Sequence, residues 1–279
     1  MLTSRGCPIG CLFCASCNYW GLKYRARSAE NVLSEIMYLK EKYGADEIQF
    51  ADDQLILNKK RTKELLEGFK KTGIPHFSTP GGLYTNALDE ELIKLLKESG
   101  FYQITLAIES ADPYIQKNVI GKVVDLEKAK RLVKYAHKLD MTIHGFFVFG
   151  LPGETREQMK KSFSYAYELD VDSMSYYVAQ PIPGSKLYDI CIEKGLLETG
   201  SYEDLDLKSG VANLSEVDSK ELEVWVSEEC AKYMKSYVFR HPVKFLKKYW
   251  KYIFTNKNSD SNFFQNIISV IYSFKKSKN

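Results

Sequence analysis

The chain of 279 residues has no uninterrupted apolar run of 18 residues or more, so its sequence predicts no membrane-spanning helix. Its first twenty residues also lack the continuous apolar core of a secretory signal peptide. We therefore expect a cytoplasmic protein, neither secreted nor inserted into a membrane. Because disulfides are rare in a reducing cytosol, metal binding, redox chemistry or simple burial better explains the six cysteines.

Acidic residues are almost missing from the last part of the chain. Residues 232–279 contain eleven lysines or arginines and a single acid, so this segment carries +10 and the rest of the chain −7. We expect an α/β domain over residues 1–200 and a C-terminal extension over residues 201–279 with basic amphipathic helices. The extension would dock on the acidic domain or contact an anionic membrane surface peripherally, and nucleic acid is the disfavoured alternative. The apolar face of its first helix would comprise Phe245, Leu246, Tyr249, Trp250 and Ile253.

Short β-prone runs alternate with amphipathic helical patterns through the middle of the sequence. A strand followed by a helix, repeated about every thirty residues, predicts a parallel sheet with right-handed crossovers. The sheet could belong to a barrel or to an open doubly wound fold. The expected strands are Glu47 to Ala51, His76 to Thr79, Gln103 to Ile108, Thr142 to Phe149 and Met174 to Ala179.

Polar or glycine-rich residues follow each of these runs. In parallel α/β folds the active site lies at the carboxyl ends of the strands, so these residues would share one rim. Carboxylates that reach this rim from two different strands are the most informative. The segments concerned are Asp52 with Asp53, Pro80 to Gly82, Glu109 with Ser110, Gly150 to Glu154, and Gln180 to Ser185.

Four of the six cysteines lie within residues 7–17. Cys7, Cys11 and Cys14 have the spacing C-x3-C-x2-C, and Cys17 follows three residues later. Thiolates this close together can surround one metal centre, and both structural zinc and an iron–sulfur cluster use such ligands. Phe13 favours the cluster, because an aromatic side chain beside an open iron could cover the ring of an organic ligand.

The segment RGCPIGCLFC resembles the signature of the radical S-adenosylmethionine (radical SAM) superfamily. Further segments, among them IQFADDQLILNKKR, GFFVFGLPGET and PIPGSKLYD, are similar in order and spacing to the subgroup that carries an N-terminal cobalamin-binding domain. The resemblance implies a partial (β/α)6 TIM-type barrel and a 4Fe-4S cluster held by Cys7, Cys11 and Cys14. SAM would chelate the open iron, and its reductive cleavage would yield methionine and a 5′-deoxyadenosyl radical that attacks the substrate.

The resemblance also implies where SAM would lie. Asp52 and Asp53 would contact its methionyl amine or the substrate, and Glu109 with Ser110 would lie beside the ribose. Cys17 stands outside the three-cysteine motif, and we expect it to point away from the open iron. The adenine contacts would come from Phe13, Gly150 and Gly153.

Only six residues precede Cys7, so the cobalamin-binding domain of the subgroup is not in this sequence and the first barrel strand is shortened. A missing domain or a partner protein would supply cobalamin. The expected reaction is radical modification of a small-molecule or lipid-like substrate, such as methyl transfer or ring rearrangement, with an electron donor of the flavodoxin or ferredoxin type. The alternatives are an iron–sulfur or zinc module without SAM chemistry, and a truncated fragment that needs a separate cobalamin-binding partner. No residue is assigned to the catalytic step itself.

Overall fold

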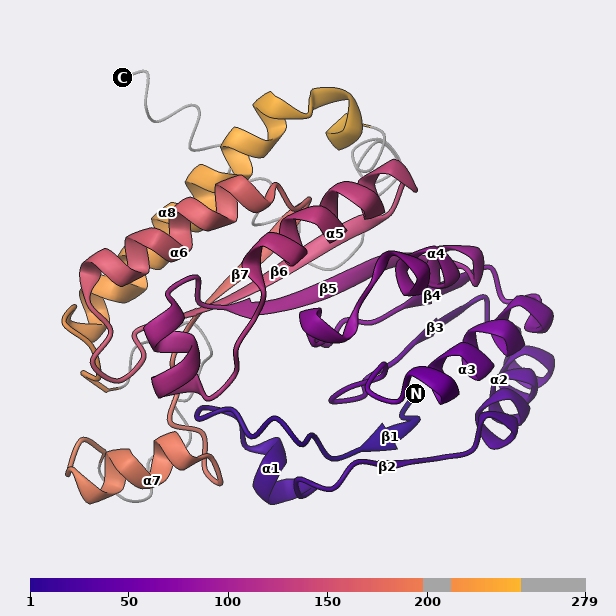
Figure 1. The fold of residues 1–279 in the computed structure, drawn as a ribbon, viewed down its shortest axis with the longest axis horizontal. Helices are drawn as coiled ribbons and strands as arrows, with labels where there is room; N and C mark the ends of the chain where they lie inside the picture. The colour runs from indigo at the N-terminus through magenta and orange to yellow at the C-terminus, as the bar shows by residue number, and fades with distance from the viewer. Residues whose placement is uncertain (198–211, 247–279) are drawn as a thin grey trace. The chain divides into compact units, whose positions relative to one another are not determined.

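A computed structural model describes residues 1–197 and 212–246 (Figure 1). Five parallel strands form one sheet in the order β3-β4-β5-β6-β7, and a separate two-stranded antiparallel pair joins β1 to β2. The strands are β1 (Ser4–Arg5), β2 (Arg25–Ala26), β3 (Glu47–Gln49), β4 (His76–Ser78), β5 (Phe101–Glu109), β6 (Thr142–Phe149) and β7 (Ser173–Val178).

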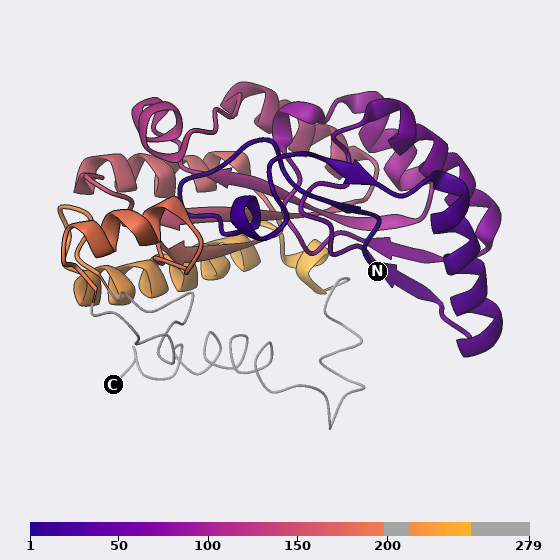
Figure 2. The ribbon, with the colours of Figure 1, turned by 90° about the horizontal axis from the view of Figure 1, so that it is seen from below.

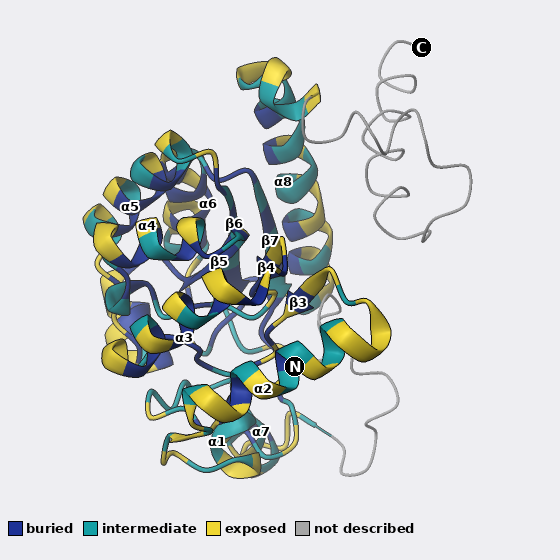
Figure 3. Ribbon diagram, turned by 90° about the vertical axis from the view of Figure 1, so that its right-hand side faces the viewer, coloured by how far each residue is buried: buried dark blue, intermediate teal, exposed yellow. Residues whose placement is uncertain are grey.

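Helices connect successive strands of the parallel sheet. Figure 3 shows their buried faces turned toward the strands and their exposed faces turned outward. The helices are α1 (Ser16–Tyr19), α2 (Ala29–Tyr43), α3 (Lys59–Thr72), η1 (Thr85–Ala87), α4 (Glu90–Glu98), η2 (Ile115–Ile120, a π-helix), α5 (Leu126–Lys138), α6 (Arg156–Leu169), α7 (Lys186–Glu193) and α8 (Ser219–Arg240). The order and parallel pairing confirm the partial TIM-type barrel that the sequence predicts, and all five expected strands are present.

Local sequence signals explain where the helices begin and end. The side chains of Asn58 and Asp89 accept hydrogen bonds from the backbone at the starts of α3 and α4. Thr155 and Gln158 form the capping box of α6. At the end of α3, Gly73 has a φ of 67°, a conformation that glycine adopts without strain.

Stacked aromatic rings form the core between the first strands and α3. The ring of Phe50 stacks on Phe69 at 5.3 Å, and the ring of Phe69 stacks on Phe77 at 4.8 Å. Phe101 joins this stack, and all four side chains are about 1% exposed or less. Such stacked rings contribute to folding stability beyond the area they bury, so this core stabilises the first half of the sheet.

Residues at the N-terminus lie beside β3. The amine of Met1 donates to the Gln49 carbonyl at 2.8 Å, and Ala51 N donates to the Met1 carbonyl at 2.9 Å. This pair of bonds is the pattern of a parallel ladder, so the edge of β3 that the sequence leaves partly unpaired receives one bridge. The segment from β1 to β2 then lies across the open side of the curved sheet, as Figure 2 shows.

The chain divides into two compact units, residues 1–226 and 227–279. In the first unit, the beginning of α8 packs on α6 through Trp225, whose ring lies 5.1 Å from that of Phe163. Of the second unit, the structure describes the remainder of α8 and residues 241–246, of which 242–246 are helical. The expected helix-face residues Tyr249, Trp250 and Ile253 lie outside the described residues, as does the proposed domain boundary at residue 200. No helix within the described ranges combines the length and apolar content needed to cross a bilayer.

Candidate functional site

Cys7, Cys11, Cys14 and Cys17 lie in one loop, which leaves the barrel at β1 and returns at β2. Ser4 pairs with Ala26 and Arg5 with Arg25, which closes the loop at its base. Inside the loop, Leu12 N donates to the Ile120 carbonyl at 3.0 Å, and the Leu12 carbonyl accepts from Leu187 N at 3.0 Å. The loop is therefore held between the end of η2 and the start of α7, at the carboxyl ends of the strands.

Asp52 and Asp53 fasten this loop to the end of β3. Asp52 is buried and accepts hydrogen bonds from Thr3 N, Thr3 Oγ1 and Ser4 N, at 2.5, 2.6 and 3.0 Å. Asp53 accepts from Gly6 N at 3.3 Å and from the Ser16 hydroxyl at 2.7 Å. Both carboxylates thus reach the predicted rim. Asp52 positions residues 3 and 4 ahead of the cysteines, whereas Asp53 connects Gly6, just before Cys7, to the side chain of Ser16, after Cys14.

The thiols lie close enough to influence each other electrostatically. Burial raises the pKa of Cys7, and the neighbouring Cys14 and Cys17 raise it further. Burial also raises the pKa of Cys11 to about 12, although the ammonium of Lys122 opposes this change. Because metals bind thiolates and not thiols, loading this site must release protons.

The donor set fits a thiolate-bound cluster. Cys7, Cys11 and Cys14 are partly exposed and free of disulfides, and the loop between them contains no other metal-ligating side chain. Gly10 has a φ of 71°, which lets the loop turn between the first two cysteines. Within the described ranges, no three His, Cys, Asp or Glu side chains converge as they would around a single metal ion. The side chains of Cys7, Cys11 and Cys14 are thus not gathered around a common point here, and Cys17 is as exposed as they are. Their chemical type suits an iron–sulfur cluster, and the assignment of these three thiols as its ligands stays a prediction.

Glu109 lies at the end of β5 in a strained conformation. Its φ is 68°, and the register between β5 and β6 shifts between Ala107 and Glu109. Such an irregularity turns a side chain out of the regular alternation of the strand. Glu109 pairs with the buried ammonium of Lys122 at 2.9 Å, and Lys122 also donates to the Ala107 carbonyl at 2.7 Å. Both charges influence the pKa of Cys11, so this ion pair lies beside the cysteine loop.

Ser110 and Phe13 have different surroundings from Glu109. The Ser110 hydroxyl is fully buried and lies 3.3 Å from the hydroxyl of Ser162 on α6, so it secures the strand end to a helix. Phe13 is half-buried and packs against a cluster of apolar residues under the cysteine loop. That cluster also contains Cys191, which is fully buried, as expected of an isolated cysteine.

The turn after β6 is organised around Glu154. Its Oε2 atom accepts hydrogen bonds from Gly150 N at 2.9 Å and Leu151 N at 3.1 Å. Its buried Oε1 atom has no hydrogen-bond partner among the residues that the structure describes. Burial raises the pKa of Glu154 to about 8. Gly150 has a φ of 76°, which favours glycine, and an added Cβ atom would lie 2.4 Å from a methyl group of the flexible Leu222 side chain. Gly153, with a φ of 71°, has open space around it.

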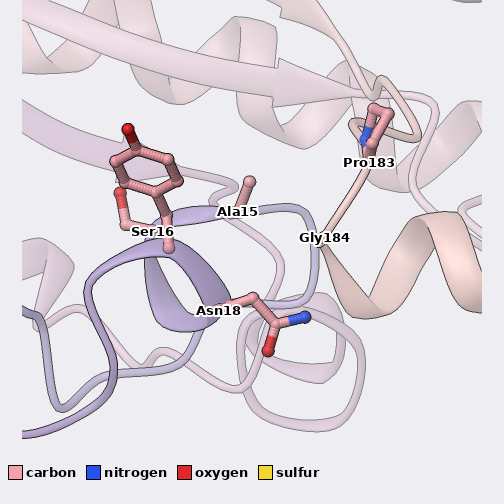
Figure 4. A pocket seen from close by; sticks show the side chains of 6 residues that line it. Ala15, Ser16, Asn18, Pro183 and Gly184 are labelled. Carbon is pink, nitrogen blue, oxygen red and sulfur yellow. The ribbon is translucent and has the colours of Figure 1, made fainter.

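An open hollow of about 380 Å³ lies beside the cysteine loop (Figure 4). It separates α1, which contributes Ser16 and Asn18, from Pro183 and Gly184 in the loop between β7 and α7. Its lining carries no charge and no thiol. The hollow is therefore an outer surface of the loop and not a ready-made cofactor pocket.

Two residues of the site were missed by the sequence analysis. Lys122 follows Gly121 directly and stands before two valines, and an isolated lysine beside apolar residues is the only sequence signal it offers. Ser16 falls within the cysteine motif but has no role there until the fold brings Asp53 to it. Both depend on contacts between residues 13 or more positions apart.

Comparisons with known proteins agree with this site. A family model described as the radical SAM superfamily matches residues 1–166. Cytidylyl-2-hydroxyethylphosphonate methyltransferase of Streptomyces wedmorensis is 39% identical over 221 residues, which cover 77% of this chain and 41% of that protein. An uncharacterised methyltransferase of Pyrococcus horikoshii is 34% identical over 222 residues, covering 80% of this chain and 48% of that protein.

Among solved structures, the fold is similar to that of the radical SAM methyltransferase TsrM from Kitasatospora setae, solved with cobalamin and a 4Fe-4S cluster. The TM-score is 0.63 at 20% identity, over 72% of this chain and 40% of TsrM. The chain thus spans less than half the length of these relatives. With the family model covering more than half of the chain and the cysteine loop at the carboxyl ends of the strands, the chain belongs to the radical SAM superfamily.

Proposed function

We propose that this chain is the radical SAM catalytic part of a methyltransferase-type enzyme. Cys7, Cys11 and Cys14 would hold a 4Fe-4S cluster, whose chemistry when bound is the reductive cleavage of SAM. The observation that carries the proposal is that Cys11 lies beside the buried Glu109–Lys122 pair, at the end of the sheet where α/β enzymes bind their ligands.

The chain's own residues would position the cofactors. Asp52 and Asp53 hold the two sides of the cysteine loop, so the thiols approach from a fixed base. Glu109 supplies acceptor oxygens for ribose hydroxyls, and Lys122 compensates its charge while it is buried. Phe13 rests on an apolar cluster, which leaves its ring available to cover a bound organic ligand.

Methyl transfer is the proposed outcome, and cobalamin is the proposed carrier of the methyl group. The name of the relative from Streptomyces wedmorensis and the cobalamin bound in TsrM support both points. A cobalamin-binding domain or partner protein would supply this cofactor, and the substrate would be a small or lipid-like molecule.

The experiment compares the wild type with Cys14→Ala and the matched variant Cys17→Ala after anaerobic reconstitution with iron and sulfide. We expect about four irons per chain in the wild type, and 5′-deoxyadenosine formed from SAM once dithionite is added. Cys14→Ala should lose the bound iron and the formation of 5′-deoxyadenosine. Cys17→Ala should keep the iron and the activity, because Cys17 lies outside the three-cysteine motif. Stoichiometric zinc without an iron–sulfur absorption band, or equal damage by both variants, would contradict the proposal.

A further inference from the structure

The base of the cysteine loop carries an unbalanced positive charge. Residues 1–29 contain Arg5, Lys23, Arg25 and Arg27 and no acid at all. Arg27 is neutralised by Glu35 at 2.5 Å. The three other basic side chains are exposed, and no ion pair to them occurs among the described residues.

The hairpin geometry brings two of these cations together. Arg5 and Arg25 are directly paired in the antiparallel ladder, where like charges normally destabilise a strand pair. Trp20 separates them, since the Arg5 guanidinium lies 4.9 Å from the centre of its ring and Arg25 donates to its carbonyl at 2.6 Å. These contacts with Trp20 offset the repulsion and hold two exposed arginines at neighbouring positions of the hairpin.

One exposed and one partly buried aromatic side chain adjoin these cations. Tyr19 is 77% exposed, and its ring lies 4.6 Å from that of Trp20 in an edge-to-face arrangement. We call Arg5, Tyr19, Trp20, Lys23 and Arg25 together the basic neck. Arginine with tyrosine and tryptophan is the composition that protein interfaces favour.

The basic neck forms the base of the cysteine loop. A Cβ atom at Gly6 would lie 2.3 Å from the Lys23 carbonyl and 2.9 Å from the Gly21 carbonyl, so residues 21–23 touch the residue that precedes Cys7. Asp53 and the acids of α7 add no net negative charge to this surface. Asp53 is occupied by Gly6 and Ser16, and α7 with its C-cap holds two lysines and two acids.

We propose that the basic neck is the docking surface for an acidic one-electron carrier protein. This inference rests on the proposed function, which needs one electron from outside for each SAM cleaved. That electron leaves the reduced flavin or iron–sulfur group of the carrier and enters the centre held by the cysteines; the carrier is oxidised by one electron, and no proton or bond is transferred at the interface. Charge complementarity suits such a partner, because transient redox interfaces are small and steered electrostatically.

Binding is the direct test. The reconstituted chain is titrated calorimetrically with an acidic bacterial flavodoxin at low and at high salt. We expect Arg5→Glu with Lys23→Glu to weaken binding at least about tenfold, as charge reversal does at steered interfaces, and added salt to weaken the wild type likewise. The matched control, Lys71→Glu with Lys138→Glu, reverses two exposed charges at the ends of α3 and α5, at the opposite end of the sheet, and should change binding less than about twofold.

The choice of Arg5→Glu keeps the hairpin intact. A glutamate at this position faces Arg25 and replaces like charges with an attractive pair, so the loop should close as well as before. Lys23→Glu alone serves as a second variant, with the same direction of effect. A basic carrier, cytochrome c, should not bind the wild type.

Dithionite separates this inference from the proposed function. With dithionite as reductant, the neck variant should cleave SAM as fast as the wild type, because no carrier is needed. Failure of the wild type with dithionite would overturn the proposed function. Normal dithionite activity with unchanged flavodoxin binding in the neck variant would overturn the docking surface alone, and so would neck-dependent binding to phosphatidylglycerol vesicles without binding to flavodoxin.

Discussion

Glu109 shows how one residue can carry both strain and charge at a site. A positive φ is costly for a residue with a side chain, and a buried carboxylate is costly unless it is paired. Lys122 removes the second cost, and the register shift in β5 accommodates the first. Positive φ angles and buried charges of this kind cluster at functional sites, so the combination agrees with the proposed role of Glu109 in ligand binding.

The buried carboxyl group of Glu154 leads to a testable prediction about stability and pH. Its pKa is about 8 in the folded chain against an ordinary value of 4.5, so the folded state holds a proton that the unfolded state releases. The resulting stabilisation is complete below pH 4.5 and is lost as the pH rises through about 8. We expect the free energy of unfolding of the wild type to decrease between pH 6 and pH 8.5, by on the order of 1 kcal/mol or more. The midpoint of urea unfolding, measured at both pH values, should fall accordingly.

Glu154→Gln should flatten this pH dependence, because the amide keeps an acceptor for Gly150 N and Leu151 N without a titrating group. The control is Glu157→Gln, which removes an exposed carboxylate from the first turn of α6, the helix that begins just after Glu154. If both variants keep the slope of the wild type, Glu154 does not titrate in this range.

Among the elements, the two-residue pairing of β1 with β2 closes the entire cysteine loop. Gly6 lies next to this pairing with a φ of 88° and with two backbone carbonyls within reach of any added Cβ. Backbone atoms cannot move aside as flexible side chains do. The closure therefore depends on glycine at this position.

Gly6→Ala should thus open the loop and reduce cluster loading to below about a tenth of the wild type, a loss of roughly 1.4 kcal/mol or more in loading free energy. Iron content after reconstitution measures this directly. Gly44→Ala is the matched control, since Gly44 has a φ of 65° but nothing within 4 Å of an added Cβ. Equal loss in both variants would mean that backbone strain, not collision, is responsible.

At the scale of the whole molecule, the barrel core and the cysteine loop have different sources of stability. The sheet is held by continuous ladders and by stacked aromatic rings. The loop from residue 6 to residue 24 is held by a few hydrogen bonds, two of them to the carboxylate of Asp53. Local opening should therefore be easiest in the loop.

Hydrogen exchange should report this difference. Without iron, amides of residues 6–24 should exchange much faster than those of β5 and β6, and cluster loading should slow the loop by at least about tenfold, since a ligand that binds only the closed form stabilises it. The sheet should change little. Cys14→Ala should show no slowing, and equal slowing across the sheet would indicate that the barrel itself needs the cluster.

Local patterns were sufficient for much of this architecture. Alternating apolar runs indicated the strands, and Asn58, Asp89 and Thr155 cap their helices through neighbours three residues away, so both kinds of signal are local. The assignments of Asp52, Asp53, Glu109, Ser110, Gly150 and Gly153 to SAM came from a family resemblance and stay predictions. The structure gives each of them a position and a set of protein contacts.

The sequence by itself determined the alternation of strands and helices, the three-cysteine spacing and the charge imbalance, since each depends on the order of nearby residues. Only the tertiary structure decided that Lys122 faces Glu109, that Asp52 and Asp53 hold the loop, and that Arg5 stands opposite Arg25. These contacts join residues far apart in the chain. Their formation depends on register, burial and the path of the connecting backbone, which no local pattern encodes.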